Sequence, residues 1–116
     1  MSIRIKRVYD EPATDDGYRV LVDRLWPRGV SKERAQLDEW LKEVAPSSEL
    51  RTWFGHRPER FTEFSQHYQA ELMHNPAVAQ IKAAAKQHES VTLLYAASDT
   101  EINHAQVLLK YLQHQG

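Results

Sequence analysis

The stretch VLVDRLWPRG, residues 20–29, begins as an apolar strand and ends in charged residues, a proline and a glycine. We predict a strand over residues 18–25, in which Leu21 and Leu25 share one face. Because the other face is also apolar, both faces are expected to be covered, as in the centre of an α/β sheet. Pro27 cannot donate a ladder hydrogen bond, so the strand must end before it.

Two further segments have the pattern of strands. Residues 91–97, VTLLYAA, form a continuous apolar run typical of a buried parallel strand, and residues 3–8 alternate apolar and basic side chains. The chain between 18–25 and 91–97 is long enough for a parallel crossover, so both strands end on one edge of the sheet, where open α/β folds bind ligands. The direction of the first strand stays open, because the loop at 10–17 is short for a parallel crossover.

The remaining segments carry helical patterns. Residues 31–44 place apolar side chains at the i, i+3, i+4, i+7 spacing of an amphipathic helix: Leu37, Trp40, Leu41 and Val44. Other helices are predicted after Ser47 or Ser48 up to Gly55, after Pro58 through Leu72, from Asn75 to about His88, and from Ser98, which forms a capping box with Glu101. We therefore predict one α/β domain over residues 1–116, with a mainly parallel sheet of about three to four strands flanked by helices.

The composition narrows the possible functions. The chain has 41% hydrophobic residues, 27% charged residues and a formal net charge of −1, so nucleic acid is not a favoured partner. No apolar run approaches the ~18 residues of a membrane span, and the N-terminal segment lacks the apolar core of a signal peptide. We expect a cytoplasmic protein. The absence of cysteine excludes disulfides, thiolate metal sites and cysteine nucleophiles.

Three basic residues, Arg24, Arg28 and Lys32, follow the central strand in one short loop. Arginine matches the geometry of carboxylate and phosphate groups, and a helix beginning near Lys32 would add backbone donors. We interpret these residues as an anion site. The alternative is that Asp23 and Arg24 form an ordinary ion pair. The loop lacks the glycine pattern of a P-loop.

A second polar group, Asp99, Asn103 and His104, follows the strand at 91–97. Asp99 and Asn103 are four residues apart, so on a helix they share a face. An imidazole can act as a general acid or base near neutral pH, and we take Asp99 and His104 as candidate catalytic residues. The alternative is that this group only caps a helix and forms a polar surface.

Three more residues are candidates for ligand binding: Glu71, Arg51 and His56. Glu71 falls on or beside an apolar helix stripe, where a carboxylate needs a cation that the arginine loop can supply. The alternative for Glu71 is a structural salt bridge, and for His56 it is helix capping. His67, Glu71 and His74 do not have the spacing of a common metal motif, and we expect neither a metal nor a cofactor.

Four segments together resemble the YeaO-like branch of a bacterial domain-of-unknown-function family: VDRLWPRGVSKE (22–33), WLKEVAPSSELRTWFGH (40–56), the FxxFxxxYxxEL pattern from Phe61 to Leu72, and VTLLYAASDTEINHAQVLLKYL (91–112). The resemblance covers nearly the whole chain and implies a small α/β domain in a bacterial cytoplasmic protein, with no established activity. The candidate residues above all match the family's pattern: Arg24, Arg28, Lys32, Arg51, His56, Glu71, Asp99, Asn103 and His104.

The leading interpretation is a site for a small anionic ligand at the carboxyl edge of the sheet, with or without catalysis. A binding module for nucleic acid or protein is the second class of function. The blandest alternative is a structural ion-pair network that binds nothing. The sequence predicts neither the ligand nor the oligomeric state.

Overall fold

The computed structural model describes residues 2–114, so residue 1 and residues 115–116 of the predicted domain lie outside the described residues. The sheet has four strands in the order β1-β4-β2-β3, and every neighbouring pair is parallel. The strands are β1 (Ser2–Arg7), β2 (Tyr18–Leu21), β3 (Glu39–Trp40) and β4 (Ser90–Tyr95). The predicted α/β class is confirmed. Within residues 2–114, no helix has both the length and the apolar character needed to cross a membrane.

The first strand is parallel, because β1 and β2 lie on either side of β4. Residues 8–17 carry the chain across β4, and Thr92 of β4 donates a 2.7 Å hydrogen bond to the carbonyl of Asp16. The crossover is short because it contains one 3-10 turn, η1 (Thr14–Asp16), instead of a full helix. Gly17 completes it with a φ of 66°, and a Cβ there would lie 2.3 Å from a backbone carbonyl oxygen of β4, so only glycine fits.

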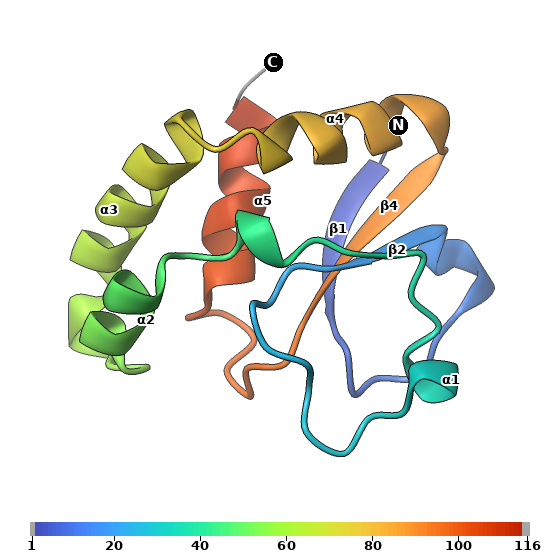
Figure 1. Ribbon diagram of the computed structural model, residues 1–116, viewed down its shortest axis with the longest axis horizontal. Coiled ribbons are helices and arrows are strands. Elements are labelled where there is room, and N and C mark those ends of the chain that lie inside the picture. The colour runs from blue at the N-terminus through green and yellow to red at the C-terminus, as the bar shows by residue number, and fades with distance from the viewer. Residues whose placement is uncertain (1, 115–116) are drawn as a thin grey trace.

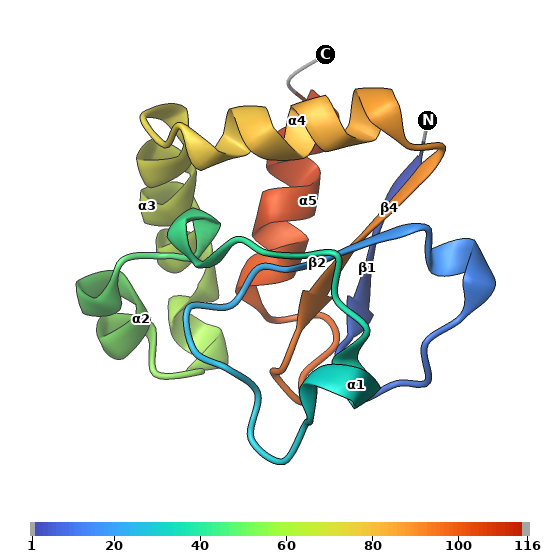
Figure 2. The same cartoon turned by 45° about the vertical axis from the view of Figure 1, so that its right-hand side comes forward.

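The helices build the larger core on one face of the sheet. α5 (His104–His114) packs on β1 and β4, α3 (Phe61–Met73) packs on α5, and α2 (Ser48–Phe54) packs on α3 (Figure 1). α4 (Ala77–Gln87) lies at the end of the sheet where β4 begins, whereas α1 (Lys32–Ala35) lies near the opposite end (Figure 2).

A smaller cluster of Val8, Leu21 and Leu94 covers the other face, with Trp26 and Leu37 packed against it. Both faces of β2 and β4 are therefore buried, as the sequence predicted. The helices predicted after Ser47, Pro58 and Asn75 are also confirmed: the Ser47 hydroxyl accepts the N–H of Leu50, the 3-10 turn η3 (Pro58–Arg60) leads into α3, and the Asn75 side chain accepts the N–H of Ala77.

The helix predicted over residues 31–44 is wrong. The segment forms α1, then β3 as a short edge strand beside β2, then the 3-10 turn η2 (Lys42–Val44). Gln36 ends α1 with a left-handed φ of 46°, and the Asp38 carboxylate accepts the backbone N–H of Arg19 at 2.8 Å. The apolar spacing was misleading because Leu41 and Val44 are buried although the chain around them is not an α-helix. Trp40, which the helix would have buried, is 38% exposed.

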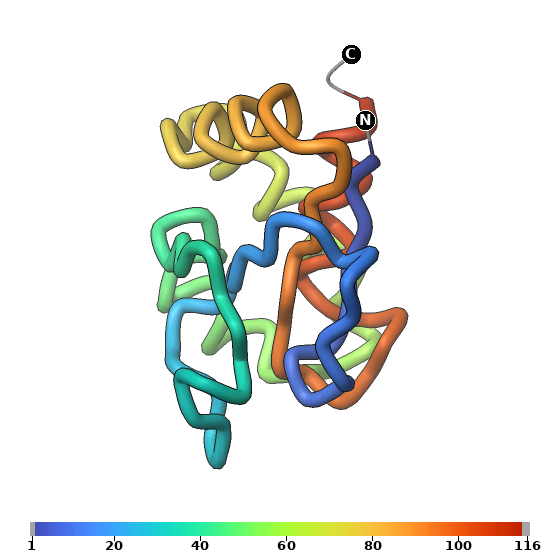
Figure 3. Tube along the Cα trace, turned by 90° about the vertical axis from the view of Figure 1, so that its right-hand side faces the viewer, coloured from blue at the N-terminus to red at the C-terminus, as the bar shows by residue number. Residues whose placement is uncertain are grey.

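The strand predicted over residues 18–25 is also shorter than expected. β2 ends at Leu21, although the N–H of Val22 still donates to the carbonyl of Leu94 at 3.0 Å. Beyond that point the chain leaves the sheet, and Leu25 is 61% exposed instead of packed on a face. The loop of residues 22–31 extends beyond the carboxyl ends of the strands, at the bottom of Figure 3.

A buried ion pair joins the crossover to the sheet. Asp16 and Arg19 are 2% and 4% exposed, and their side chains are hydrogen-bonded to each other. Lys6 contacts the same carboxylate at 3.1 Å, and Arg19 also donates to the carbonyl of Ala35 at 2.8 Å. Burial acts to raise the pKa of Asp16, but the N–H of Ala13 and the two cations outweigh it, so the pKa lies below its ordinary value.

We predict that Asp16→Asn lowers the free energy of unfolding by about 3 kcal/mol at neutral pH, because it leaves a buried arginine without its counter-charge. The sign of the pH dependence follows from the lowered pKa. The ionised carboxylate contributes stability above the unfolded-state pKa of about 3.9, and this contribution is lost as the pH falls through the folded-state pKa. Urea denaturation at several pH values should show the wild type and the variant converging in acid. A constant difference would contradict this account.

Candidate functional site

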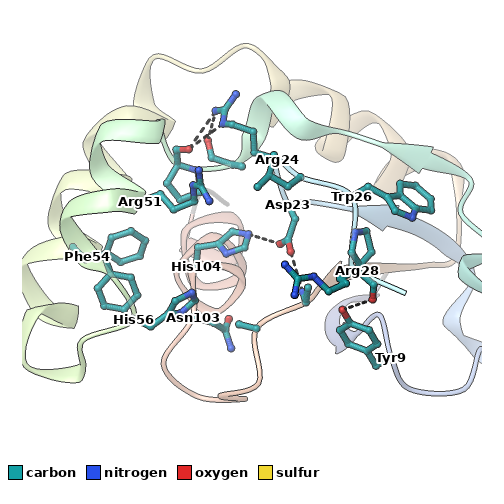
Figure 4. Close-up of a pocket in the computed structure, with 17 residues that line it drawn as sticks. Tyr9, Asp23, Arg24, Trp26, Arg28, Arg51, Phe54, His56, Asn103 and His104 are labelled. Atoms are coloured by element: carbon teal, nitrogen blue, oxygen red, sulfur yellow. Dashed lines mark hydrogen bonds and ion pairs between the residues drawn. The ribbon is translucent and has the colours of Figure 1, made fainter. Parts of the chain in front are cut away.

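A cavity of about 340 Å³ lies at the carboxyl ends of β2 and β4. Its wall comes from six parts of the chain. These are Tyr9, residues 23–28 after β2, residues 45–46, the end of α2 with its exit, Phe64 of α3, and the turn from residue 96 to the start of α5 (Figure 4). The parallel sheet therefore brings together the two polar loops that the sequence placed at this edge.

Asp23 links the loop after β2 to the turn between β4 and α5. Its Oδ2 accepts the backbone N–H of Ala96 at 3.0 Å, and its Oδ1 lies 3.0 Å from Nε2 of His104. The Asp23 carbonyl also accepts the indole N–H of Trp40 at 2.8 Å. Both carboxylate and imidazole are 17% exposed, and they form an ion pair when the ring is protonated. Among the described residues, Oδ1 is buried and accepts no hydrogen bond, and Nε2 of His104 also lies 3.2 Å from the carbonyl of Val22.

Arg24 joins two backbone segments by hydrogen bonds. Its guanidinium donates to the carbonyls of Ala45 and Pro46, both at 3.2 Å. This contact ties the loop after β2 to the segment that precedes α2. The ion pair of Asp23 with Arg24, which we weighed as an alternative, does not form; each residue has other partners.

Arg28 and Arg51 differ from Arg24. Both line the cavity, and within residues 2–114 neither guanidinium has a hydrogen-bond or ion-pair partner. The backbone of Arg28, unlike its side chain, does have a partner: its carbonyl accepts a 2.9 Å hydrogen bond from the hydroxyl of Tyr9. Figure 4 shows the Arg28 side chain reaching into the cavity beside Asp23, and Arg51 entering from α2. Both side chains are exposed, so their guanidinium groups can reach a ligand from solvent.

His56 lies on the same wall as α2. It follows Gly55 at the end of the helix, and both residues have a left-handed φ, of 57° and 53°. The left-handed backbone conformation costs glycine little free energy, but it costs histidine about 1 kcal/mol or more. The turn places the His56 ring 6.0 Å from the ring of Phe54, and both rings line the cavity.

Asn103 lines the cavity and directly precedes α5. It is 1% exposed; its Oδ1 accepts the N–H of Gln106 at 2.9 Å, and its amide donates to the carbonyl of Asp99 at 2.8 Å. The helix therefore begins at His104, and the predicted capping box of Ser98 with Glu101 is wrong. Asp99 and Asn103 do not share a helix face.

Three of the predicted site residues lie outside the cavity lining: Lys32, Glu71 and Asp99. Lys32 is exposed in α1. Asp99 is exposed, and its Oδ1 accepts the N–H groups of Ile102 and Glu101, both at 2.9 Å, which lower its pKa. These two contacts hold the turn before α5.

Glu71 also has a structural partner. Its carboxylate accepts the backbone N–H of Ser47 at 2.9 Å and the Ser47 hydroxyl at 2.6 Å. The expectation that Glu71 needs a cation from the arginine loop is wrong, because the start of α2 supplies these donors instead. Nearby, the Tyr68 hydroxyl donates to the carbonyl of Val44, and burial raises the pKa of Tyr68 well above its ordinary value.

The sequence interpretation missed Asp23 as a site residue, and it treated Phe54 only as packing. Asp23 could have been found from the sheet rule alone, because it follows directly on the strand that pairs with residues 91–97. The cavity holds three arginines and one aspartate among its lining residues, and so it carries positive formal charge when its histidines are neutral.

Comparisons with known proteins confirm the resemblance. Residues 2–115 match the family model described as "Inactive DUF488-N3 subclade". The chain is 45% identical over 113 residues to "Uncharacterized protein YeaO" of Escherichia coli K12, which covers 97% of this chain and 98% of the relative. It is 44% identical over 110 residues to "Uncharacterized protein Rv3073c" of Mycobacterium tuberculosis H37Rv. The matched region covers 95% of this chain and 92% of that relative. No solved structure gives a significant match. The chain therefore belongs to the DUF488-N3i family.

Proposed function

We propose that this protein binds a small anion, through a carboxylate or phosphate group, in the cavity at the carboxyl edge of its sheet. The observation that carries the proposal is the pair Arg28 and Arg51, which line the cavity without a partner in the described chain. The family description as inactive favours binding without turnover. His104 then serves to hold Asp23, instead of transferring protons.

The local charge supports an anionic ligand. The whole chain has a formal net charge of −1, yet arginines outnumber acidic residues around the cavity by three to one. The one acid, Asp23, is engaged by Ala96 and His104. A guanidinium offers several donors in a plane, which suits bidentate binding of a carboxylate or phosphate. Arg28 and Arg51 have these donors available.

The purely structural alternative accounts for only part of the charged cluster. Arg24 and Asp23 hold backbone segments together, as a structural network would. Arg28 and Arg51 contribute no such contact, so a network gives no reason for their place at the cavity. The near-neutral net charge also speaks against an extended nucleic-acid surface.

We predict that Arg28→Ala and Arg51→Ala each weaken the binding of benzoate or pyrophosphate by about tenfold or more, since a charge-assisted hydrogen bond contributes about 1.5–3 kcal/mol. Isothermal titration calorimetry measures the affinities. Arg57→Ala is the matched control, because Arg57 is an exposed arginine that follows α2 and does not line the cavity. Absence of binding to any tested anion, or equal losses in all three variants, would contradict the proposal.

A stability measurement separates binding from a structural network. Arg24→Ala should lower the free energy of unfolding by about 1–3 kcal/mol, because two backbone carbonyls lose their donor. Arg28→Ala should change it by less than about 0.5 kcal/mol, since an exposed side chain without partners is removed. Urea denaturation at neutral pH provides both values. A destabilisation by Arg28→Ala as large as that by Arg24→Ala would favour the network.

A further inference from the structure

The wall of the cavity is more apolar than a site for an inorganic ion requires. It includes carbon-rich side chains from the loop after β2, the segment before α2, α2 itself, α3 and the residue after β4: Leu25, Pro27, Ala45, Phe54, Phe64 and Ala96. Phe54 and Phe64 are already only 5% and 1% exposed, so a phosphate or acetate ion would satisfy Arg28 and Arg51 but leave mainly the exposed side chain of Leu25 in contact with water. Burying such surface is favourable by roughly 25 cal/mol per Å².

Leu25 is the most informative of these residues. It lines the cavity and is 61% exposed, although its neighbours Arg24 and Trp26 are both held by hydrogen bonds. Its exposure is therefore not the result of a loose loop. Met73 is similarly exposed, at 68%, but it is the last residue of α3 and does not line the cavity. The two residues form a natural pair for comparison.

Aromatic rings form another part of the lining, and the two phenylalanines among them, Phe54 and Phe64, are 5% and 1% exposed. Phe54 stacks on Phe64 with ring centroids 4.3 Å apart, and His56 lies beside Phe54. Figure 4 shows Phe54 and His56 on one side of the cavity, with Arg28 extending toward them from the other. A volume of about 340 Å³ is at the lower end of the range for ligand pockets.

From these observations, and resting on the anion site proposed above, we propose that the ligand is an organic anion with a compact apolar body of one or two rings. The carboxylate or phosphate group pairs with Arg28 and Arg51 at the opening. The apolar body lies between Leu25 and the rings of Phe54 and His56, where it covers the exposed side chain of Leu25. This ligand class complements the charge and the apolar wall at the same time, which an inorganic ion does not.

The test compares acetate, benzoate and 2-naphthoate, which carry the same charge on bodies of increasing apolar size. Calorimetry with the wild-type protein should give affinities that rise along this series, by on the order of tenfold or more from acetate to 2-naphthoate. The neutral analogue 2-naphthalenemethanol should bind at least about tenfold more weakly than 2-naphthoate.

Leu25→Gln should lower the ratio of the affinities for 2-naphthoate and acetate by about fivefold, while Met73→Gln should leave that ratio unchanged. Both residues are exposed, so both variants are expected to fold, and their melting temperatures check this. Equal affinities for the three acids, with a loss in Arg28→Ala, would overturn the apolar ligand class and keep the anion site. Equal binding of 2-naphthoate and its neutral analogue, or no binding at all, would overturn both.

Discussion

The carboxylate of Asp23 is the contact on which the site depends. It accepts the N–H of Ala96 just after β4 and faces His104 at the first turn of α5, while its own backbone follows β2. The loop after β2 and the turn between β4 and α5, which are far apart in sequence, are therefore fixed at one point. The arginines of the loop after β2 lie next to this point, and the contacts of Arg24 with the carbonyls of Ala45 and Pro46 tie the same loop to the segment before α2.

The arginines of this chain have different roles because their surroundings differ. Arg19 is buried and balanced by Asp16, and it fastens the crossover and α1 to the sheet. Arg24 is partly buried and satisfied by backbone carbonyls. Arg28 and Arg51 remain exposed on the cavity wall without partners in the described residues. The fold thus uses some guanidinium groups for its own assembly and leaves others available for a ligand.

Much of the architecture could be predicted from the sequence. The apolar run at 91–97 and the strand-end rule placed Arg24 and Arg28 beside Asn103 and His104, because parallel strands end on one edge. The contacts that could not be predicted join residues distant in sequence. Glu71 meets Ser47 only because α3 packs on α2, and no local pattern encodes that pairing. Residues 31–44 misled the prediction because an edge strand and two short turns produced apolar spacing that fits a helix.

The central claim is that Arg28 and Arg51 hold an anion whose body fills the cavity. A crystal structure of the protein with 4-bromobenzoate tests this most directly, because anomalous scattering locates the bromine independently of the rest of the electron density. The account predicts one bromine site beside Leu25 and Phe54, with the carboxylate bonded to Arg28, Arg51 or both. A bromine site elsewhere, or an occupied cavity with both guanidinium groups turned away from the carboxylate, would contradict it.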